Sequence, residues 1–335
     1  MRLFIVDNQA SNWGSTRIYR DNLAYFLINQ GVEVQRSNQT HTINKPDSIL
    51  FGKNSTEKEI NCFKQMYPDA LIGIVHPTNA TKRDREKIRL VEYFVVGSLE
   101  ERDGLLKFGK PIFQFPQIEN IPLAPKKHST KSELMIGYHG NRMHIENAGP
   151  EFWGAIDQIA DESCAKLRLI YNIKSVGKVK IKTRMPTEHV QWDPKTVWRS
   201  LGECDIGLVP GVVNLGLGTR LYNTYLDRKS GFKGDYMIRF KSNSNAGRSF
   251  VFFQLGIPVV AGLIPSNLHI LGNPDCGYIA ISQSGWYQGM RALVQSAEHR
   301  QKVADCAKRA FEREYDPNKW ARRFIAGLAG ICKTS

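Results

Sequence analysis

Residues 239–260, RFKSNSNAGRSFVFFQLGIPVV, place a polar loop, a short helix and a strand directly one after another. The loop at 241–245 offers several residues that cap helices, and the apolar positions within 247–255 suit a short, largely buried helix. Gly256 is a natural helix stop, and 257–260 has the composition of a buried strand. A helix that leads straight into a buried strand is typical of parallel α/β sheets.

The N-terminus of such a helix lies at the edge where the strands of a parallel sheet end, which is where these folds bind ligands. Unpaired backbone N–H groups and the helix dipole favour an anion there. Basic, hydroxyl and amide side chains crowd this end and supply what a phosphate or diphosphate needs. These candidates are Arg239, Lys241, Ser242, Asn245 and Arg248. An ordinary capped helix with solvated basic residues is the alternative explanation.

Strand and helix patterns alternate along the rest of the chain. The alternation predicts the α/β class, with two doubly wound, Rossmann-like parallel-sheet domains facing a cleft. Strands are expected at 2–6, 32–34, 47–51, 70–75, 93–96, 111–115, 134–138, 167–171, 190–192, 205–209, 257–260 and 277–281. Helices are expected at 17–29, 57–66, 99–108, 151–160, 194–201, 247–255, 285–295, 298–314 and 319–331. The alternating lysines of 178–184 predict an amphipathic strand or arm.

A stretch without periodicity, 117–132, is rich in Pro, Lys, Ser and Thr and predicts a linker. A chain of 335 residues is long enough for two domains. We therefore expect an N-terminal domain at 1–125, a second domain at 132–315 and a terminal helix at 316–335. The loop at 212–238 is long for a compact domain, and we expect it to cover a ligand.

Composition excludes several classes of protein. With 41% hydrophobic and 23% charged residues, the chain matches a globular protein, and no apolar run reaches the roughly 18 residues of a membrane span. The opening MRLFIVDNQ becomes polar too early for a signal peptide. The six cysteines show no ligand spacing, so we expect reduced thiols in a cytoplasmic protein and no metal site.

The net charge of +14 suits an anionic partner. Nucleotide phosphates, a phospholipid-linked acceptor at a membrane face, and nucleic acid all meet that description. Nucleic acid is disfavoured because a binding platform interleaves exposed aromatic and basic residues, whereas the aromatic residues here fall mostly at core-like positions.

Loops that follow strands hold the remaining candidates. Gly140 and Asn141 follow the first strand of the second half, where a glycine lets a phosphate approach the backbone. His76 ends a strand of the first half, where a general base facing the cleft would lie, and Asp7 ends the first strand. The alternative explanation for Gly140 and Asn141 is a tight turn, and the alternative for His76 is a structural histidine.

The C-terminal half resembles the donor domain of GT-B glycosyltransferases. The resemblance rests on the order of GYHGN (137–141), VQW (190–192), CDIGLVP (204–210), LGIPVV (255–260) and GYIA (277–280), with Trp286 opening a helix. The N-terminal half is more loosely similar to their acceptor domain, through its first strand, the turn at Gly14 and Ser15, and GVEV at 31–34. In such enzymes the last helix crosses back to the N-terminal domain, and 316–335 is expected to do so.

Many retaining members of the family carry paired glutamates around the helix before the Gly-x-Pro-Val strand. No glutamate lies between Lys241 and Val260 here. Arg248, Asn245 and Ser242 occupy the region instead. The resemblance therefore implies neither the nucleotide nor the stereochemistry of transfer.

The resemblance implies a cytoplasmic, metal-independent glycosyltransferase for polysaccharide or glycolipid biosynthesis. A nucleotide sugar would be the donor substrate with no further cofactor, and a saccharide or lipid-linked molecule the acceptor, with peripheral contact at the inner membrane face as a further expectation. The five candidates within 239–248 would bind the donor together with Gly140 and Asn141. Gly14 and Ser15 would bind the acceptor. Either His76 or Asp7 would be the base. The alternatives are a nucleotide-sugar epimerase on the same fold and a non-enzymatic polyanion-binding protein.

Overall fold

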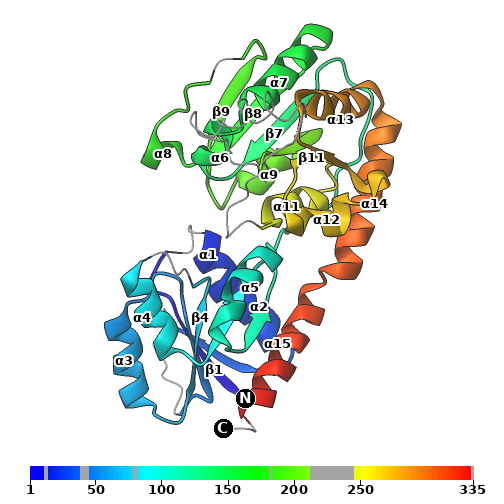
Figure 1. The fold of residues 1–335 in the computed structure, drawn as a ribbon. Coiled ribbons are helices and arrows are strands. Elements are labelled where there is room, and N and C mark those ends of the chain that lie inside the picture. Colours follow the sequence, from blue (N-terminus) through cyan, green and yellow to red (C-terminus); the bar gives the residue numbers. More distant parts are fainter. Residues whose placement is uncertain (11–13, 38–44, 78–80, 182, 212–244, 333–335) are drawn as a thin grey trace, which may run out of the picture. The chain divides into compact units, whose positions relative to one another are not determined.

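The computed structural model describes residues 1–335 apart from 11–13, 38–44, 78–80, 182, 212–244 and 333–335. The described chain divides into two compact units, each with its own sheet (Figure 1). Unit 1 comprises Met1–Pro122, Asn245–Val251 and Phe311–Ser335, and unit 2 comprises Leu123–Ser244 and Phe252–Ala310.

Unit 1 contains a parallel sheet with the strand order β2-β1-β3-β4-β5-β6. Its strands are β1 (Arg2–Val6), β2 (Glu33–Arg36), β3 (Ser48–Phe51), β4 (Leu71–Val75), β5 (Tyr93–Val96) and β6 (Ile112–Gln114). Because β2 lies on one side of β1 and β3 on the other, the winding reverses between β1 and β3. Doubly wound sheets bind ligands beside the carboxyl ends of the strands at such a switch point.

Helices cover both faces of this sheet. One face packs against α1 (Gly14–Thr16), a π-helical turn (Arg17–Asn22), α2 (Leu23–Ile28) and α15 (Pro317–Cys332). The other packs against α3 (Glu57–Met66), α4 (Lys82–Leu90) and α5 (Leu99–Leu105), which continues into a 3-10 turn (Leu106–Phe108). Strand alternation produces the two cores, since Leu3 and Ile5 face α2 while Ile49 and Phe51 face α3. The ring of Phe324, on α15, lies 5.5 Å from that of Phe113.

Unit 2 repeats the architecture with the strand order β12-β11-β10-β7-β8-β9. Its strands are β7 (Met135–His139), β8 (Lys166–Tyr171), β9 (Thr187–Gln191), β10 (Ile206–Val209), β11 (Val259–Gly262) and β12 (Tyr278–Ala280). Its winding reverses between β7 and β10. The helices are α6 (Arg142–Glu146), α7 (Pro150–Glu162), α8 (Ile173–Val176), α9 (Val197–Gly202), α11 (Gly247–Gln254, which begins in unit 1), α12 (Pro265–Leu271), α13 (Gln283–Gln295) and α14 (Ala297–Glu314), with a 3-10 turn at Pro274–Cys276.

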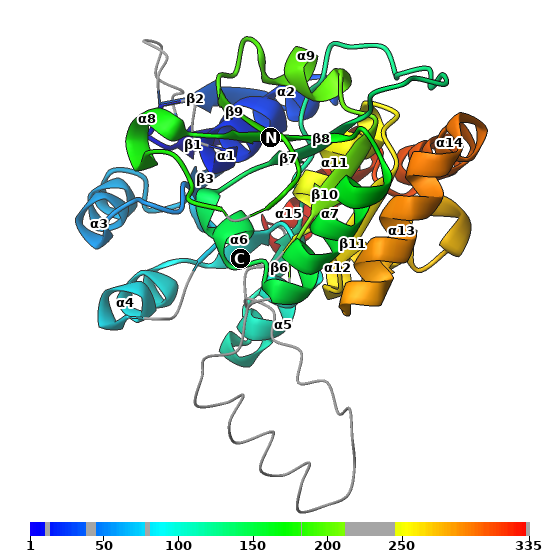
Figure 2. The ribbon, with the colours of Figure 1, turned by 90° about the horizontal axis from the view of Figure 1, so that it is seen from above.

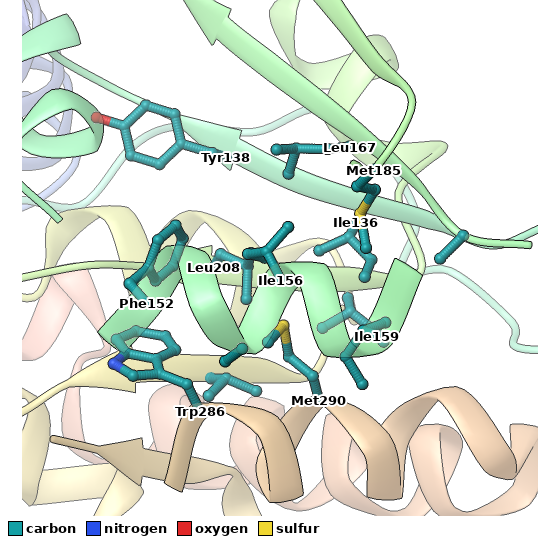
Figure 3. Packing of buried hydrophobic residues seen from close by; sticks show 14 of the residues in the cluster. Ile136, Tyr138, Phe152, Ile156, Ile159, Leu167, Met185, Leu208, Trp286 and Met290 are labelled. Carbon is teal, nitrogen blue, oxygen red and sulfur yellow. The ribbon is translucent and has the colours of Figure 1, made fainter. Parts of the chain in front are cut away.

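The main core of unit 2 lies between its sheet and the neighbouring helices α7 and α13 (Figures 2 and 3). Phe152 and Trp286 meet edge to face there, with their ring centroids 4.9 Å apart. On the opposite face of the sheet, two strand positions are glycines that leave no room for a side chain. A Cβ at Gly137 would collide with Cys204, and one at Gly207 would lie 2.6 Å from the ring of Phe252 on α11. The small strand residues therefore let α11 pack closely on β10.

The expected α/β architecture is confirmed, and each expected strand appears within a few residues of its predicted position. The alternating stretch 178–184 is not a strand in its described residues. Val179 is buried and donates its N–H to the hydroxyl of Tyr171. That bond lies outside any ladder, so of the two expectations, a strand or an arm, the strand is wrong.

The expectation of six reduced thiols is also wrong. Cys276 and Cys306 form a disulfide, with their Cα atoms 4.9 Å apart. The two cysteines are 30 residues apart, and this spacing does not indicate a pairing. The packing of the 3-10 turn against α14 brings the two sulfurs together. Cys62, Cys164 and Cys204 are free thiols.

The segment that follows Pro122 is fixed to unit 2 by polar contacts. Lys126 Nζ lies 3.0 Å and Lys131 Nζ 2.9 Å from one carboxylate oxygen of the buried Asp205. The second oxygen accepts the N–H of Met135. His128 adds an imidazole contact of 2.9 Å to the carbonyl oxygen of Gly256. These contacts anchor the start of β7.

Candidate active site at the carboxyl edge of the first sheet

Polar residues gather where the strands of unit 1 end. His76 follows β4, Gly97 follows β5, and Gln117 lies three residues after β6. Glu101 lies on α5, directly after the Gly97 turn. Because the strands are parallel and adjacent, their carboxyl ends bring these residues to one edge.

His76 is buried in a left-handed backbone conformation, with φ +46°. Only a few per cent of residues other than glycine adopt positive φ, and such strain clusters at functional sites. The Tyr19 ring meets the imidazole edge to face, with centroids 4.4 Å apart. A fixed backbone and a fixed ring therefore hold the side chain in one place.

The Glu101 carboxylate joins His76 to the neighbouring strand end. Oε1 lies 2.6 Å from His76 Nδ1, and Oε2 accepts the N–H of Gly97 at 2.7 Å. Nδ1 makes no bond with the angles of a regular hydrogen bond. Two lone-pair atoms 2.6 Å apart repel each other unless a proton lies between them, so a proton lies between Nδ1 and the carboxylate.

Gln117 contacts the other ring nitrogen. Its Nε2 lies 3.2 Å from His76 Nε2. The same side chain abuts the start of α11, since a Cβ at Gly247 would lie 3.0 Å from Gln117 Cβ. Gln117 is thus a physical link between the histidine and the N-terminus of this helix.

The π-helical turn brings several polar side chains to this edge. Tyr19 Oη donates to the carbonyl oxygen of Phe115 at 3.1 Å. Arg20 is buried and donates to two carbonyl oxygens of the loop after β1, those of Asp7 and Gln9, at 2.8 and 2.9 Å. A π-helical turn has a wider register than an α-helix, and such turns are frequent at functional sites.

A buried ion pair closes one side of this region. Arg17 Nε donates to Glu119 Oε2 at 2.9 Å, and its Nη2 contacts the other carboxylate oxygen. Asn22 donates to the backbone carbonyl oxygen of Ile118. The helix after β1 is therefore fastened to the segment after β6.

Tyr19 is kept neutral by its surroundings. Burial raises the pKa of its phenol well above the ordinary value, and the nearby Glu101 charge raises it further. A hydrogen bond with Gln117 lowers it, but by less than these effects together. Tyr19 therefore remains a donor to Phe115 across the physiological pH range.

Asp7 lies at the switch point, where its side chain is in close contact with Gly52 after β3. One carboxylate oxygen accepts the Gln9 N–H at 3.0 Å, and the other accepts the Thr16 hydroxyl at 3.0 Å. The carboxylate is buried and bonded on both sides. The structure does not bring it into the His76 group, because β3 lies between β1, which Asp7 follows, and β4, which His76 follows.

Gly14 and Ser15 open α1, directly after the undescribed residues 11–13. Gly14 is exposed, and a Cβ there would lie 3.9 Å from Arg17 Nη2. Both residues therefore stand on the same helical segment as Tyr19, at the carboxyl edge of the sheet.

Two of the seven donor candidates lie at the start of α11. Asn245 accepts the N–H of Gly247 through its side-chain oxygen at 3.1 Å, and Arg248 lies partly buried in the first turn of α11. Both belong to unit 1, as His76 does. Arg239, Lys241 and Ser242 lie outside the described residues.

Gly140 and Asn141 follow β7 at the switch point of unit 2. Gly140 has φ +133°, a conformation that side chains disfavour. The Asn141 side chain accepts the N–H of Met143 at 2.9 Å and caps α6. The backbone of this turn is therefore shaped by its glycine and fixed by its asparagine.

Sequence inspection missed Glu101, Gln117 and Tyr19. Ser98 and Glu101 have the spacing of a capping box, and Ser98 does accept the Glu101 N–H at 3.2 Å. The Glu101 side chain, however, reaches Gly97 and His76 instead of the N-cap backbone. The spacing alone could have drawn attention to Glu101, whereas the roles of Gln117 and Tyr19 depend on the tertiary fold.

Comparisons with known proteins give likeness in structure alone. No protein-family model matches the chain, and no curated protein matches its sequence. Sucrose-phosphate synthase from Thermosynechococcus elongatus matches over 100% of both chains, with a TM-score of 0.64 and 10% identity. Trehalose-6-phosphate synthase from E. coli, bound with UDP-2-fluoro glucose, matches over 98% of this chain and 99% of its own, with a TM-score of 0.62 and 10% identity.

Anabaena HepE in complex with UDP matches over 98% of this chain and 99% of its own, with a TM-score of 0.58 and 11% identity. Together with the two doubly wound sheets, these matches show a GT-B type fold, as the resemblance implied. Within the described residues no helix has the length and hydrophobicity of a bilayer span. No group of three or more His, Cys, Asp or Glu side chains in that part of the chain could hold a metal ion.

Proposed function

We propose that the protein is a metal-independent glycosyltransferase that moves a sugar from a nucleotide-activated donor to a saccharide or lipid-linked acceptor. The observation that carries the proposal is the strained, buried His76 beside the first turn of α11, with Gln117 between them. A helix N-terminus favours the diphosphate of such a donor, and a histidine at hydrogen-bonding range suits proton transfer or the orientation of a hydroxyl.

The α11 residues would bind the donor diphosphate. Arg248 brings a positive charge to the first turn, and the departing nucleotide phosphate needs such a charge in the absence of a metal. Asn245 shapes the turn by capping Gly247. Arg239 and Lys241 extend the basic character of this segment in the sequence, and Ser242 adds a hydroxyl.

Gly140 would contribute backbone contacts at the switch point of unit 2. Its φ of +133° suits glycine, and the absence of a side chain would let a phosphate approach the backbone. Gly14 and Ser15, at the edge of unit 1, would bind the acceptor. Units 1 and 2 would thus serve as the acceptor-side and donor-side domains. Since HepE and the E. coli synthase are bound with uridine nucleotides, we take a uridine-activated donor as the first to test.

We assign the catalytic role to His76. The Asp7 carboxylate already bonds Gln9 and Thr16 within the loop it shapes. The basic balance of +14 also suits a lipid-linked acceptor, so we include peripheral contact with the inner membrane face and a cytoplasmic location in the proposal. Polysaccharide or glycolipid assembly is the setting in which such an acceptor occurs.

The direct test is phosphorus NMR of a panel of nucleotide sugars incubated with the protein, EDTA, and saccharide or lipid acceptor pools. We expect one donor to yield free nucleoside diphosphate in step with glycosylated acceptor, and His76→Ala to slow this at least about 100-fold. Conversion of one nucleotide sugar to an isomer would favour the epimerase alternative. Intact donors throughout, with every pool, would contradict the proposal.

A further inference from the structure

The contacts around His76 specify which of its ring nitrogens carries the proton. Gln117 Nε2 is an amide donor and faces His76 Nε2 at 3.2 Å, so that ring nitrogen is the acceptor. The Glu101 carboxylate is an acceptor and lies 2.6 Å from Nδ1, so that nitrogen carries the proton. The two contacts require the same tautomer.

We propose that Glu101 is a positioning residue that holds His76 with Nδ1 protonated, so that Nε2 is presented as the acceptor toward Gln117 and α11. The catalytic use of this tautomer rests on the proposed function, in which the acceptor nitrogen takes a hydrogen bond from a substrate hydroxyl. Gln117 occupies that nitrogen in the structure, and a hydroxyl donor would take its place.

A backbone hydrogen bond orients the Glu101 side chain. Its Oε2 accepts the N–H of Gly97 at 2.7 Å, which directs Oε1 to the imidazole. The carboxylate is buried with the histidine, at 8% and 7% side-chain exposure. Water therefore does not compete well for either partner.

The surroundings keep the ring from turning. A Cβ at Gly97 would lie 3.1 Å from His76 Cε1 and 3.0 Å from Gln117 Cγ, so the glycine leaves only enough room for the observed arrangement. Tyr19 packs against the imidazole from the helix after β1. A ring flip would point Nε2 away from α11, and these neighbours oppose it.

The variant Glu101→Gln tests the tautomer directly. A carboxamide offers one acceptor and one donor group, and the Gly97 N–H needs the acceptor. The amide NH₂ then faces Nδ1, which must accept, so the proton moves to Nε2. The ring changes from an acceptor to a donor on the side of α11, while the shape of the side chain stays the same.

The measurement is two-bond ¹⁵N–¹H correlation NMR of histidine-labelled protein, with the His76 signals identified by their loss in His76→Asn. We expect the Nδ1-protonated pattern in the wild type and the Nε2-protonated pattern in Glu101→Gln. Asp103→Asn, a change at an exposed carboxylate on the same helix, should keep the wild-type pattern. An Nδ1-protonated ring in Glu101→Gln, or an Nε2-protonated ring in the wild type, would overturn the proposal.

A second variant, Gln117→Glu, tests the proposal if Glu101→Gln does not fold. Gln117→Glu places a carboxylate at each ring nitrogen and should give a ring protonated at both, whereas an unprotonated Nε2 would count against the contact.

Kinetics then separate this proposal from the proposed function. Under the proposed function Glu101→Gln lowers kcat about tenfold or more with little change in KM. The tautomer result stands by itself if no sugar transfer is found.

Discussion

Gln117 and Gly247 are in contact at the start of α11: a Cβ built on the glycine would lie 3.0 Å from Gln117 Cβ and 3.1 Å from its Oε1. The substitution Gly247→Ala should therefore push Gln117 away from His76. We expect about tenfold or greater loss of turnover, because small displacements in a reacting site are costly. The free energy of unfolding should change by no more than about 1 kcal/mol, since alanine is the better helix former and offsets the crowding.

Gly104→Ala is the matched control for this prediction. Gly104 lies on α5, and a Cβ there meets no atom within 4 Å. The variant Gly104→Ala should therefore leave turnover unchanged. Equal activity of both glycine variants would show that Gln117 does not need its observed position.

Replacement of Asp7 distinguishes a structural carboxylate from a general base. Asp7→Asn should cost about 1–2 kcal/mol of unfolding free energy, because a carboxylate bonded to Gln9 and Thr16 loses one acceptor. Turnover of the folded variant should stay within a few-fold of the wild type. Thr16→Val removes the same hydrogen bond from the other side and should behave alike. A loss of about 100-fold or more in Asp7→Asn alone would transfer the base role to Asp7.

Asp205 should make stability depend on pH. Burial raises the pKa of its carboxyl, but the Met135 N–H and the two lysines, Lys131 and Lys126, lower it by more, so its pKa lies below the ordinary value. Burial lowers the pKa of Lys126 even though this lysine lies beside Asp205. The pair therefore stabilises the charged form of the carboxyl group more than the charged form of the lysine. The stabilisation is present above the unfolded pKa of about 3.9 and is lost as the pH falls through the lower folded value.

Urea unfolding of Asp205→Asn measures this effect. We expect a loss of about 3 kcal/mol at pH 7, because two lysines lose a buried partner. The gap to the wild type should narrow below about pH 4. Asp161→Asn breaks an exposed pair with Arg184 and should cost less than about 1 kcal/mol. A gap for Asp205→Asn that is independent of pH would contradict the assignment.

Thiol reactivity should follow burial. Burial raises the pKa of Cys204 to about 12, which leaves almost no thiolate near neutral pH. Iodoacetamide followed by peptide mass mapping should label the exposed Cys62 and Cys164 first and Cys204 only after denaturation. Cys276 and Cys306 should require a reductant. Labelling of Cys204 as fast as Cys62 in the native protein would show that the segment before β10 is accessible.

The strands could be predicted from the sequence more completely than the helices that cover the sheets. Buried strands such as β4 and β10 are short apolar runs, and their period and turn residues are local properties. The helix α4 was missed because only Ile88 is buried in it, so its apolar pattern is too weak to recognise. The capping box at Thr81 was the signal available there. The helix α12 was missed as well, although Pro265 at its start is a common helix opening.

The candidate site was predicted only in part. His76 was identified because it ends a strand, which is a local property. Its contacts with Glu101 and Gln117 join three strand ends and could not be read from spacing, since 25 and 41 residues separate these positions from the histidine in the printed sequence. The placement of Asn245 and Arg248 with His76 in unit 1 likewise depends on how α11 packs.

Calorimetric titration with UDP, GDP, ADP, dTDP, CDP and CMP in EDTA tests the central claim most directly. One nucleotide should bind selectively, and Arg248→Ala should weaken it about ten- to hundred-fold, as expected for a lost charge-assisted hydrogen bond. Arg102→Ala, at an exposed arginine of α5, should not. Binding of none of the six, together with salt-sensitive binding to DNA or RNA, would contradict the account and favour a polyanion-binding protein.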